Sequence, residues 1–180
     1  HGVLVRPSAD IDGFYRMMQT TAQRDGFALH SAEYYRRAYD IFEPRGQTML
    51  LEAVLDEQPL AYLMAFRQHE RAWYFYGASD DEMRNLMPTY LLQWEAMRWA
   101  KANGAKLYDL WGIPDADEET LEEQFTQRSD GLWGVYRFKR GFGGQVRRSA
   151  PAFIRVYNPL LYRAYNMMQS RREDETHAPA

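Results

Sequence analysis

The sequence contains no cysteine, which excludes disulfide bonds, thiolate nucleophiles and cysteine-ligated metals. Histidine is also scarce, and the histidines are too scattered to have the spacing of metal ligands. No apolar run approaches the roughly 20 residues that a helix needs to cross a bilayer. We therefore expect no structural metal and no membrane-spanning segment. The four histidines are His1, His30, His69 and His177.

The 180 residues have a composition that is typical of a globular protein, since 46% are hydrophobic and 15% are aromatic. A chain of this length buries roughly two thirds of the surface that it exposes when unfolded, which implies a substantial core. Because it has no internal repeat and no linker, we predict a single domain over residues 1–172 and a flexible tail over 173–180. The chain begins with His1 rather than Met and shows no secretory signal, so we expect a fragment of a cytoplasmic protein.

Charge is distributed unevenly over the C-terminal part of the chain. Residues 108–130 contain eight acidic residues and one arginine, a net charge of −7, whereas residues 131–172 contain nine basic residues and no acidic ones. Clustered arginine and lysine attract anions and hydrogen-bond to phosphate oxygens, so the basic segment predicts an anionic partner. A solvated basic face that complements the acidic segment explains the same pattern.

Hydrophobic periodicity and turn residues predict a mixture of helices and strands. Ser8 or Asp10 is suited to cap a first helix that ends at Gly26, and Ser31 is suited to cap a second. Three β-rich runs joined by short polar turns predict an antiparallel meander. The predicted strands are 3–5, 48–55, 60–68, 72–77 and 106–111; the later helices are 89–102, 117–127, 132–140 and 159–170, with extended structure over 145–157 interrupted near Pro151.

The predicted helix 89–102 carries unusually many large apolar residues, which predicts burial against a sheet. Pro88 is suited to its first turn, and Asn103 and Gly104 to its end. We expect the tryptophans of this helix and of the strand that follows it to pack in the core. The apolar residues are Tyr90, Leu91, Trp94, Met97, Trp99 and Ala100, followed by Trp111.

The order of these elements is similar to that of GNAT-type acyltransferases. The similarity implies an α/β (α+β) fold with a mixed, mainly antiparallel central sheet flanked by helices. Members that bind acetyl-CoA carry a glycine-rich turn before the long helix, where backbone N–H groups hold the pyrophosphate. Here Arg84 to Pro88 provide no glycine and one N–H donor fewer. The sequence therefore disfavours CoA binding, although not acyl transfer.

Three stretches resemble the second half of the Fem peptidyltransferases, bacterial enzymes that use aminoacyl-tRNA to build the cross-bridge of peptidoglycan precursors. They are TTAQRDGFALHSAEYY (20–35), PTYLLQWEAMRWAKANGAKLYDLWGIP (88–114) and GVYRFKRGFGG (134–144). The resemblance implies amide formation between an amino acid esterified to tRNA and the side-chain amine at the third position of the stem peptide. The acceptor is a UDP-linked or lipid-linked muropeptide. Aminoacyl-tRNA is the co-substrate, and no other cofactor is implied.

The resemblance also implies roles for individual residues. Lys139 matches the catalytically important lysine of the family, which stabilises the oxyanion that develops when an ester carbonyl is attacked. Phe138 beside it positions the loop by packing. Tyr90 is a candidate substrate-facing tyrosine, and a buried helix residue is the alternative interpretation. Arg140 is a further candidate for substrate binding.

An Arg-x-x-x-Tyr motif that contacts diphosphate in the family corresponds to His30 and Tyr34 here. Histidine is mostly neutral at pH 7 and binds phosphate less well, so we expect Arg24 or Arg36 to substitute for it. The basic segment, with Arg147 and Arg148, is the predicted site for tRNA or another anion. Contact with tRNA phosphates would weaken steeply with salt.

Fem enzymes have two acyltransferase-like domains, and 180 residues accommodate only the second. We therefore expect a missing N-terminal domain of the same protein as a partner, an isolated chain that is inactive, and peripheral contact with the inner face of the cell membrane. Two alternatives remain: a CoA-dependent N-acetyltransferase, and a non-catalytic module that binds RNA or an anionic surface.

Overall fold

The computed structural model describes residues 2–81, 83–150 and 153–176. Contacts within the chain divide it into two compact units, residues 1–144 and residues 145–180, which we describe separately. The single domain over residues 1–172 stays a prediction. None of the helices in the described ranges combines the length and the apolar character that crossing a bilayer requires.

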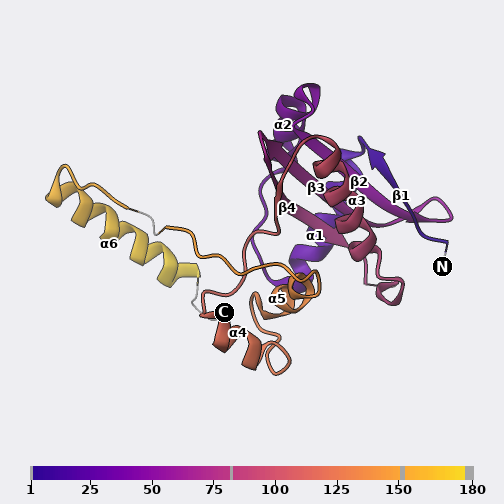
Figure 1. Ribbon diagram of the computed structural model, residues 1–180. Coiled ribbons are helices and arrows are strands. Elements are labelled where there is room, and N and C mark those ends of the chain that lie inside the picture. The colour runs from indigo at the N-terminus through magenta and orange to yellow at the C-terminus, as the bar shows by residue number, and fades with distance from the viewer. Residues whose placement is uncertain (1, 82, 151–152, 177–180) are drawn as a thin grey trace. The chain divides into compact units, whose positions relative to one another are not determined.

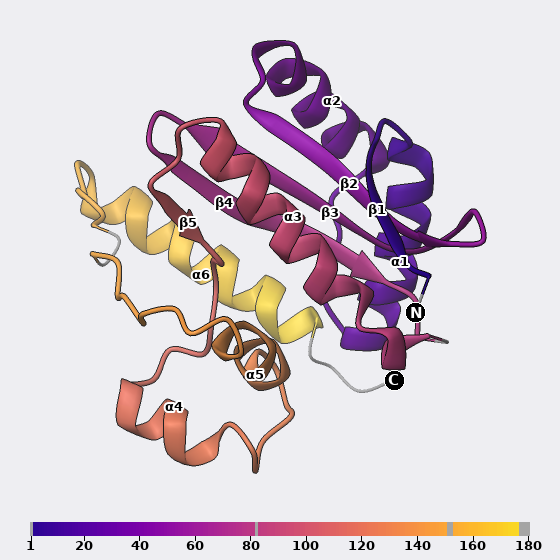
Figure 2. The same ribbon diagram turned by 45° about the vertical axis from the view of Figure 1, so that its right-hand side comes forward.

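The first unit is built on a five-stranded sheet whose strands lie side by side in chain order. Strands β1 to β4 are labelled in Figure 1 and β5 in Figure 2. The first four strands are antiparallel and β5 is parallel to β4, which confirms both the predicted meander and the mixed, mainly antiparallel sheet. Prediction and structure differ by at most a few residues at each strand end. The strands are β1 (Leu4–Ser8), β2 (Thr48–Leu55), β3 (Gln58–Gln68), β4 (Arg71–Ser79) and β5 (Leu107–Asp109).

One face of the sheet packs against α1 (Ile11–Asp25) and α2 (Ala32–Phe42). The Asp10 carboxylate accepts a hydrogen bond from Gly13 N at 2.8 Å and begins α1, and Gly26 ends it in the left-handed conformation that glycine adopts at no steric cost. Ser31 caps α2 in the same way. The helix residues meet every second side chain of the strands, as the alternation of a β-strand requires. The cluster contains Ile11, Phe14, Met18, Tyr35, Leu50, Tyr62, Met64, Phe66 and Ala78.

The opposite face is covered by α3 (Pro88–Ala102), which runs across the sheet in Figure 2. Pro88 is at its first turn, as predicted. Its Leu92 and Ala96 pack on the strand residues that alternate with those of the first cluster, among them Leu51 and Leu63. Short 3₁₀ turns complete the region: η1 (Glu43–Arg45) before β2 and η2 (Arg84–Leu86) before α3.

The prediction that Trp94 and Trp111 belong to the core is wrong, since they are 58% and 56% exposed. The sheet covers only one stripe of α3, and this stripe is filled by Leu92, Gln93, Ala96 and Ala100. The remaining apolar residues of the helix extend beyond it, including Tyr90 and Leu91, which are also exposed. Trp99 alone of the three tryptophans packs against the core, where it is half-buried.

After β5 the chain forms α4 (Glu118–Gln124) and α5 (Trp133–Arg140), so the two short helices predicted there are confirmed. Asp117 caps α4 by accepting from Thr120 N at 2.8 Å. The Glu122 carboxylate of α4 accepts hydrogen bonds from Tyr136 Oη at 2.6 Å and from Arg140 at 2.6–2.8 Å. The acidic helix α4 and the basic helix α5 therefore neutralise part of each other's charge within the protein.

The second unit contains α6 (Pro159–Thr176). The Asn158 side chain accepts from Leu160 N and Leu161 N at 3.1 and 3.2 Å and caps this helix. Residues 145–150 and 153–158 form no strand, and Pro151 lies outside the described residues. The helix continues beyond the predicted end at Ser170 and includes residues 173–176 of the predicted tail, whereas 177–180 lie outside the described ranges.

Candidate active site

The candidate site lies where β4 and β5 separate. The two strands pair from Arg71 and Leu107 to Trp73 and Asp109, after which β4 continues to Ser79 and β5 ends. On the other side of β4, the register with β3 shifts so that Phe75 has no partner. Such a bulge bends a strand and increases its twist, which favours the separation.

Lys139 of α5 provides the charged group of this region. Its side chain is only 8% exposed, and Nζ donates a hydrogen bond to the Gly112 carbonyl at 2.7 Å. Nζ also lies 5.6 Å from the ring centroid of Tyr74, within the range of a cation–π contact. The local sequence explains the burial, because Trp133, Tyr136 and Lys139 follow one another at a spacing of three residues and form the buried face of α5.

Burial also changes the acidity of the ammonium group. Desolvation lowers the pKa of Lys139 to about 8, and the negative charge of Asp109 opposes this shift. The group is therefore mostly charged at neutral pH. An ammonium in a desolvated site interacts with a developing negative charge more strongly than it does in water.

The Gly112 carbonyl is held by a strained turn. Trp111 has a φ of 64°, a left-handed conformation that is rare for a bulky residue. The Asp109 carboxylate stabilises the turn by accepting a hydrogen bond from Trp111 N at 2.8 Å. The same bond removes Trp111 N from strand pairing, which accounts for the end of β5 at Asp109 rather than at the predicted residue 111.

Two partly buried tyrosines, Tyr74 and Tyr108, lie next to this site on the face that α3 covers. Burial raises the pKa of Tyr74 to about 12, and it raises the pKa of Tyr108 well above its usual range, so both hydroxyls stay protonated. Tyr108 Oη donates to Gln93 Oε1 at 3.0 Å, and Gln93 Nε2 is buried with no partner among the described residues. A Cβ atom added to Gly77 would lie 2.1 Å from the Tyr74 hydroxyl, so the phenol requires a glycine there.

Phe138 and Tyr90, both predicted site residues, are brought together beside Lys139. Their ring centroids are 4.8 Å apart in an edge-to-face arrangement, and Phe142 lies 5.4 Å from each of them. This aromatic cluster joins the end of α5 to the start of α3. Tyr90 is 39% exposed, so its alternative interpretation as a buried helix residue is wrong.

A family model described as the FemAB family matches residues 1–57 and 48–170 of the chain. The chain belongs to the FemAB family. The resemblance inferred from the three sequence stretches is thereby confirmed.

Curated relatives of this FemAB chain are named lipid II:glycine glycyltransferase. The protein from Staphylococcus saprophyticus is 22% identical over 213 residues, which cover 83% of this chain and 48% of the relative. The protein from Staphylococcus aureus (strain USA300) is 28% identical over 128 residues, which cover 67% of this chain and 28% of the relative. The FemAB chain thus spans about half the length of the relative from Staphylococcus saprophyticus and a smaller share of the relative from Staphylococcus aureus.

Solved structures confirm the GNAT-like fold. FemX superimposes with a TM-score of 0.67 at 18% identity, covering 79% of this chain and 50% of FemX. A possible acetyltransferase from Clostridium difficile 630 superimposes with a TM-score of 0.58 at 10% identity, covering 88% of this chain and all of the other. At these identities the likeness establishes the fold alone.

In the FemAB chain, His30 and Tyr34 lie together at the start of α2. Their rings stack with centroids 4.1 Å apart, and the Tyr34 hydroxyl lies 3.2 Å from the Tyr76 hydroxyl. Burial raises the pKa of Tyr76 above its usual range, and the hydrogen bond with the Tyr34 hydroxyl raises it further. The pair is exposed to solvent, and its role in substrate binding stays a prediction.

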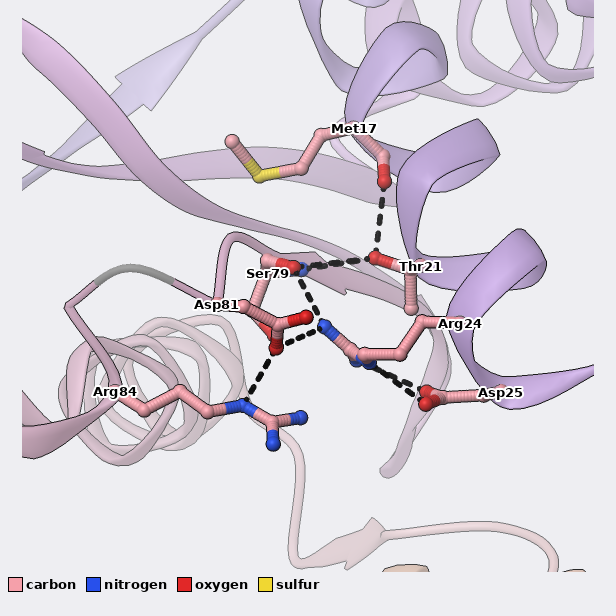
Figure 3. Close-up of polar contacts among 7 residues, drawn as sticks. All are labelled: Met17, Thr21, Arg24, Asp25, Ser79, Asp81 and Arg84. Atoms are coloured by element: carbon pink, nitrogen blue, oxygen red, sulfur yellow. Dashed lines mark hydrogen bonds and ion pairs between the residues drawn. The ribbon is translucent and has the colours of Figure 1, made fainter.

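Arg24 is occupied by groups of the protein itself (Figure 3). Its guanidinium contacts both oxygens of Asp25 at 2.7 and 2.9 Å, Asp81 at 2.9 Å and the Ser79 carbonyl at 3.1 Å. Thr21, which lies on α1 like Arg24, also hydrogen-bonds to the backbone of Ser79. These contacts attach the end of β4 to α1, and a substrate anion would compete with two carboxylates for Arg24. Arg36 likewise pairs with Asp12 at 2.5 Å.

Arg140 also faces a carboxylate. It forks onto Glu122, and its guanidinium lies 4.3 Å from the centroid of the Phe125 ring. Arg140 and Tyr136 together lower the pKa of Glu122 to about 2. In the second unit, Arg147 donates to Gln145 Oε1 at 3.4 Å. Anion binding by Arg140, Arg147 and Arg148 stays a prediction.

Within the described residues, no three His, Asp or Glu side chains come together to hold a metal ion. Sequence reasoning did not identify Gly112, Tyr74, Tyr108 or Gln93 as site residues. A signal existed for Gln93, because it is a polar residue within the stripe of α3 that faces the sheet. The others show no such signal, because only the folded chain brings them near Lys139.

Proposed function

We propose that this FemAB chain is part of an aminoacyltransferase that moves an amino acid from aminoacyl-tRNA to the stem-peptide amine of a peptidoglycan precursor. The observation that carries the proposal is Lys139, a buried ammonium held by the Gly112 carbonyl where β4 and β5 separate. The relatives named lipid II:glycine glycyltransferase support glycine as the amino acid and a lipid-linked acceptor. Because the chain spans about half of such relatives, the activity of the whole enzyme belongs to the proposal.

The proposed reaction exchanges an ester for an amide. The acceptor amine attacks the ester carbonyl carbon, a C–N bond forms, and the carbonyl oxygen becomes an oxyanion. The ester C–O bond then breaks, and the ribose hydroxyl leaves with the proton that the amine loses. The ester is already activated, so no nucleophilic side chain is required, in agreement with a chain that has no cysteine.

Lys139 is suited to stabilise the oxyanion. Its ammonium has three N–H donors, of which one is bonded to Gly112, so two remain for the reacting oxygen. The contact strengthens as charge develops, and it therefore lowers the barrier more than it stabilises the ground state. Phe138 and Tyr90 support the start of α3 and the end of α5 around this lysine.

Two further parts of the proposal concern binding. His30, Tyr34 and the basic residues Arg147 and Arg148 are candidates for the phosphates of the muropeptide and of tRNA. A lipid-linked acceptor places the reaction at the inner face of the cell membrane. We propose that residues of a further domain also line the groove for the muropeptide. Amino-acid transfer is therefore measured both with this chain and with a protein that contains such a domain as well.

The test is transfer of labelled glycine to a lysine-containing muropeptide, with the product identified by mass spectrometry. Charged tRNA is the donor, and acetyl-CoA and free glycine with ATP are the comparison donors. We expect product from charged tRNA alone, and none when the acceptor amine is acetylated. Acetyl transfer from acetyl-CoA would instead support the acetyltransferase alternative, for which the absence of a glycine-rich turn before α3 gives no support.

A further inference from the structure

One tyrosine hydroxyl beside Lys139 is not used by the fold. Tyr74 is half-buried, and its Oη makes no hydrogen bond to any residue in the described ranges. The neighbouring Tyr108 differs, because its Oη donates to Gln93 Oε1 at 3.0 Å. Tyrosine hydroxyls that leave bulk water usually find a hydrogen-bond partner, so the free O–H of Tyr74 is available to a bound molecule.

This hydroxyl lies in the gap where β4 and β5 separate. The pairing of the two strands ends at Trp73 and Asp109, so Tyr74 is the first residue of β4 beyond it. A Cβ atom at Gly77 would lie 2.1 Å from Tyr74 Oη, which places the hydroxyl against the backbone three residues further along β4. The ring centroid of Tyr74 lies 5.6 Å from Lys139 Nζ. One side chain therefore borders the ammonium with its ring and the gap with its hydroxyl.

The proposed reaction needs an acid in addition to the oxyanion donor. When the ester C–O bond breaks, the ribose oxygen departs as an alkoxide unless a proton reaches it. An alkoxide is a stronger base than a phenolate, so a neutral phenol can protonate it, and tyrosine is among the side chains that serve as general acids. Burial keeps the pKa of Tyr74 at about 12, so the phenol carries its proton at neutral pH.

We propose that Tyr74 is the general acid that protonates the leaving ribose oxygen. The inference rests on the proposed function. The phenol O–H bond breaks as the ester C–O bond breaks, and the proton moves to the ribose oxygen. The phenolate then takes the proton that the attacking nitrogen loses on becoming an amide, so no further reactant is needed. The ammonium of Lys139, beside the ring, stabilises the phenolate in the interval.

Lys139 itself is the alternative acid. It is the stronger acid of the two, since its pKa is about 8. With its proton, however, it would give up the charge that stabilises the oxyanion. The two tasks are therefore better divided between two groups, one of which stays charged while the other transfers a proton.

The test compares Tyr74→Phe with the wild type on two donors that differ in one atom. The first is tRNA charged with glycine through the natural oxygen ester. The second carries glycine on a 3′-sulfur, so that the leaving group is a thiolate, which departs without a proton. Phenylalanine keeps the ring beside Lys139 and removes only Oη. Tyr39→Phe is the matched control, because Tyr39 is also half-buried, and its hydroxyl bonds to the Ser8 carbonyl at 3.4 Å on the face that α1 and α2 cover.

We expect Tyr74→Phe to lower the single-turnover rate from the oxygen ester by about 10²- to 10⁴-fold, and to leave the KM for charged tRNA unchanged. Its rate from the thioester should fall by less than about tenfold, and Tyr39→Phe should match the wild type on both donors. A folded Tyr74→Phe protein with the wild-type rate from the oxygen ester overturns the proposal. So does an equal loss on both donors, which would mean that the hydroxyl positions the site and transfers no proton.

Lys139→Ala, measured on the same donors, separates this proposal from the proposed function. The lysine stabilises the oxyanion with either leaving group, so its removal should slow both donors alike. Transfer that depends on Lys139 but not on Tyr74 retains the function and overturns the general acid. Wild-type protein that transfers glycine from neither donor, both as this chain and with a further domain, contradicts the proposed function and the role of Tyr74 with it.

Discussion

Replacement of Lys139 by methionine is expected to stabilise the fold and to slow transfer by about 10²- to 10³-fold. Burial lowers the pKa of Lys139 from 10.5 to about 8, and each pKa unit corresponds to 1.36 kcal/mol, so charging this group costs the folded state about 3 kcal/mol more than it costs the unfolded chain. Methionine has a similar flexible stem and no charge. Gly112 is exposed, so water can replace Nζ at its carbonyl.

The pH dependence distinguishes this effect from a simple gain in packing. The unfolded chain binds the Lys139 proton more tightly than the folded one, so wild-type stability rises with pH between about 8 and 10.5, and the cost is fully present below pH 8. We expect the methionine variant to be more stable than the wild type by about 1–3 kcal/mol at pH 7 and this advantage to be about 2 kcal/mol smaller at pH 9.5.

The assay is urea unfolding of both proteins at pH 7.0 and pH 9.5, followed by circular dichroism. Lys101→Met is the control, because Lys101 is exposed on α3 and its removal should not change stability in a pH-dependent way. A methionine variant that is less stable than the wild type at both pH values, or an advantage that does not change with pH, would refute the argument that the buried ammonium is destabilising.

Three other predictions follow from the same site and its surroundings. The transfer rate should fall as pH rises through about 8, because Lys139 then loses its charge, and a rate that keeps rising above pH 9 would indicate that the lysine acts as a base. Gly77→Ala should lower the free energy of unfolding by about 1–3 kcal/mol, because the new methyl group meets the Tyr74 hydroxyl. The double variant Gly77→Ala/Tyr74→Phe should regain part of this free energy. A double variant as destabilised as Gly77→Ala alone would contradict the contact. Glu122→Gln should accelerate amide hydrogen exchange in α4 at pH 7. Because Arg140 and Tyr136 lower the pKa of Glu122, the protection of α4 in the wild type should be present above pH 4.5 and lost as pH falls toward 2. Identical exchange in the two proteins would show that α4 does not depend on this carboxylate.

Local signals in the sequence predicted much of the fold. Asp10 begins α1, Gly26 ends it, and Ser31 begins α2, as predicted. These ends were predictable because capping depends on residues within one helical turn. The β-rich runs and their polar turns predicted the meander for the same reason. The end of β5 was missed, because it depends on the Asp109 side chain bonding to Trp111 N rather than on residue propensity.

Burial was harder to predict than secondary structure. The apolar residues of α3 predicted contact with a sheet, but periodicity does not show how wide a stripe the sheet covers, so Trp94 was wrongly assigned to the core. Lys139 was identified by family resemblance, and its spacing from Trp133 and Tyr136 is consistent with its burial. Its partner at Gly112 lies 27 residues earlier in the chain, and only the tertiary structure brings the two together.

The most direct test of the central claim is the single-turnover rate of glycine transfer from charged tRNA, compared between the wild type, Lys139→Ala and Lys101→Ala. Removal of one preorganised oxyanion donor typically lowers the rate by about 10²- to 10³-fold, and we expect a loss of this size in Lys139→Ala alone. A Lys139→Ala protein that is folded and transfers glycine at the wild-type rate would contradict the assignment of this lysine as the catalytic cation.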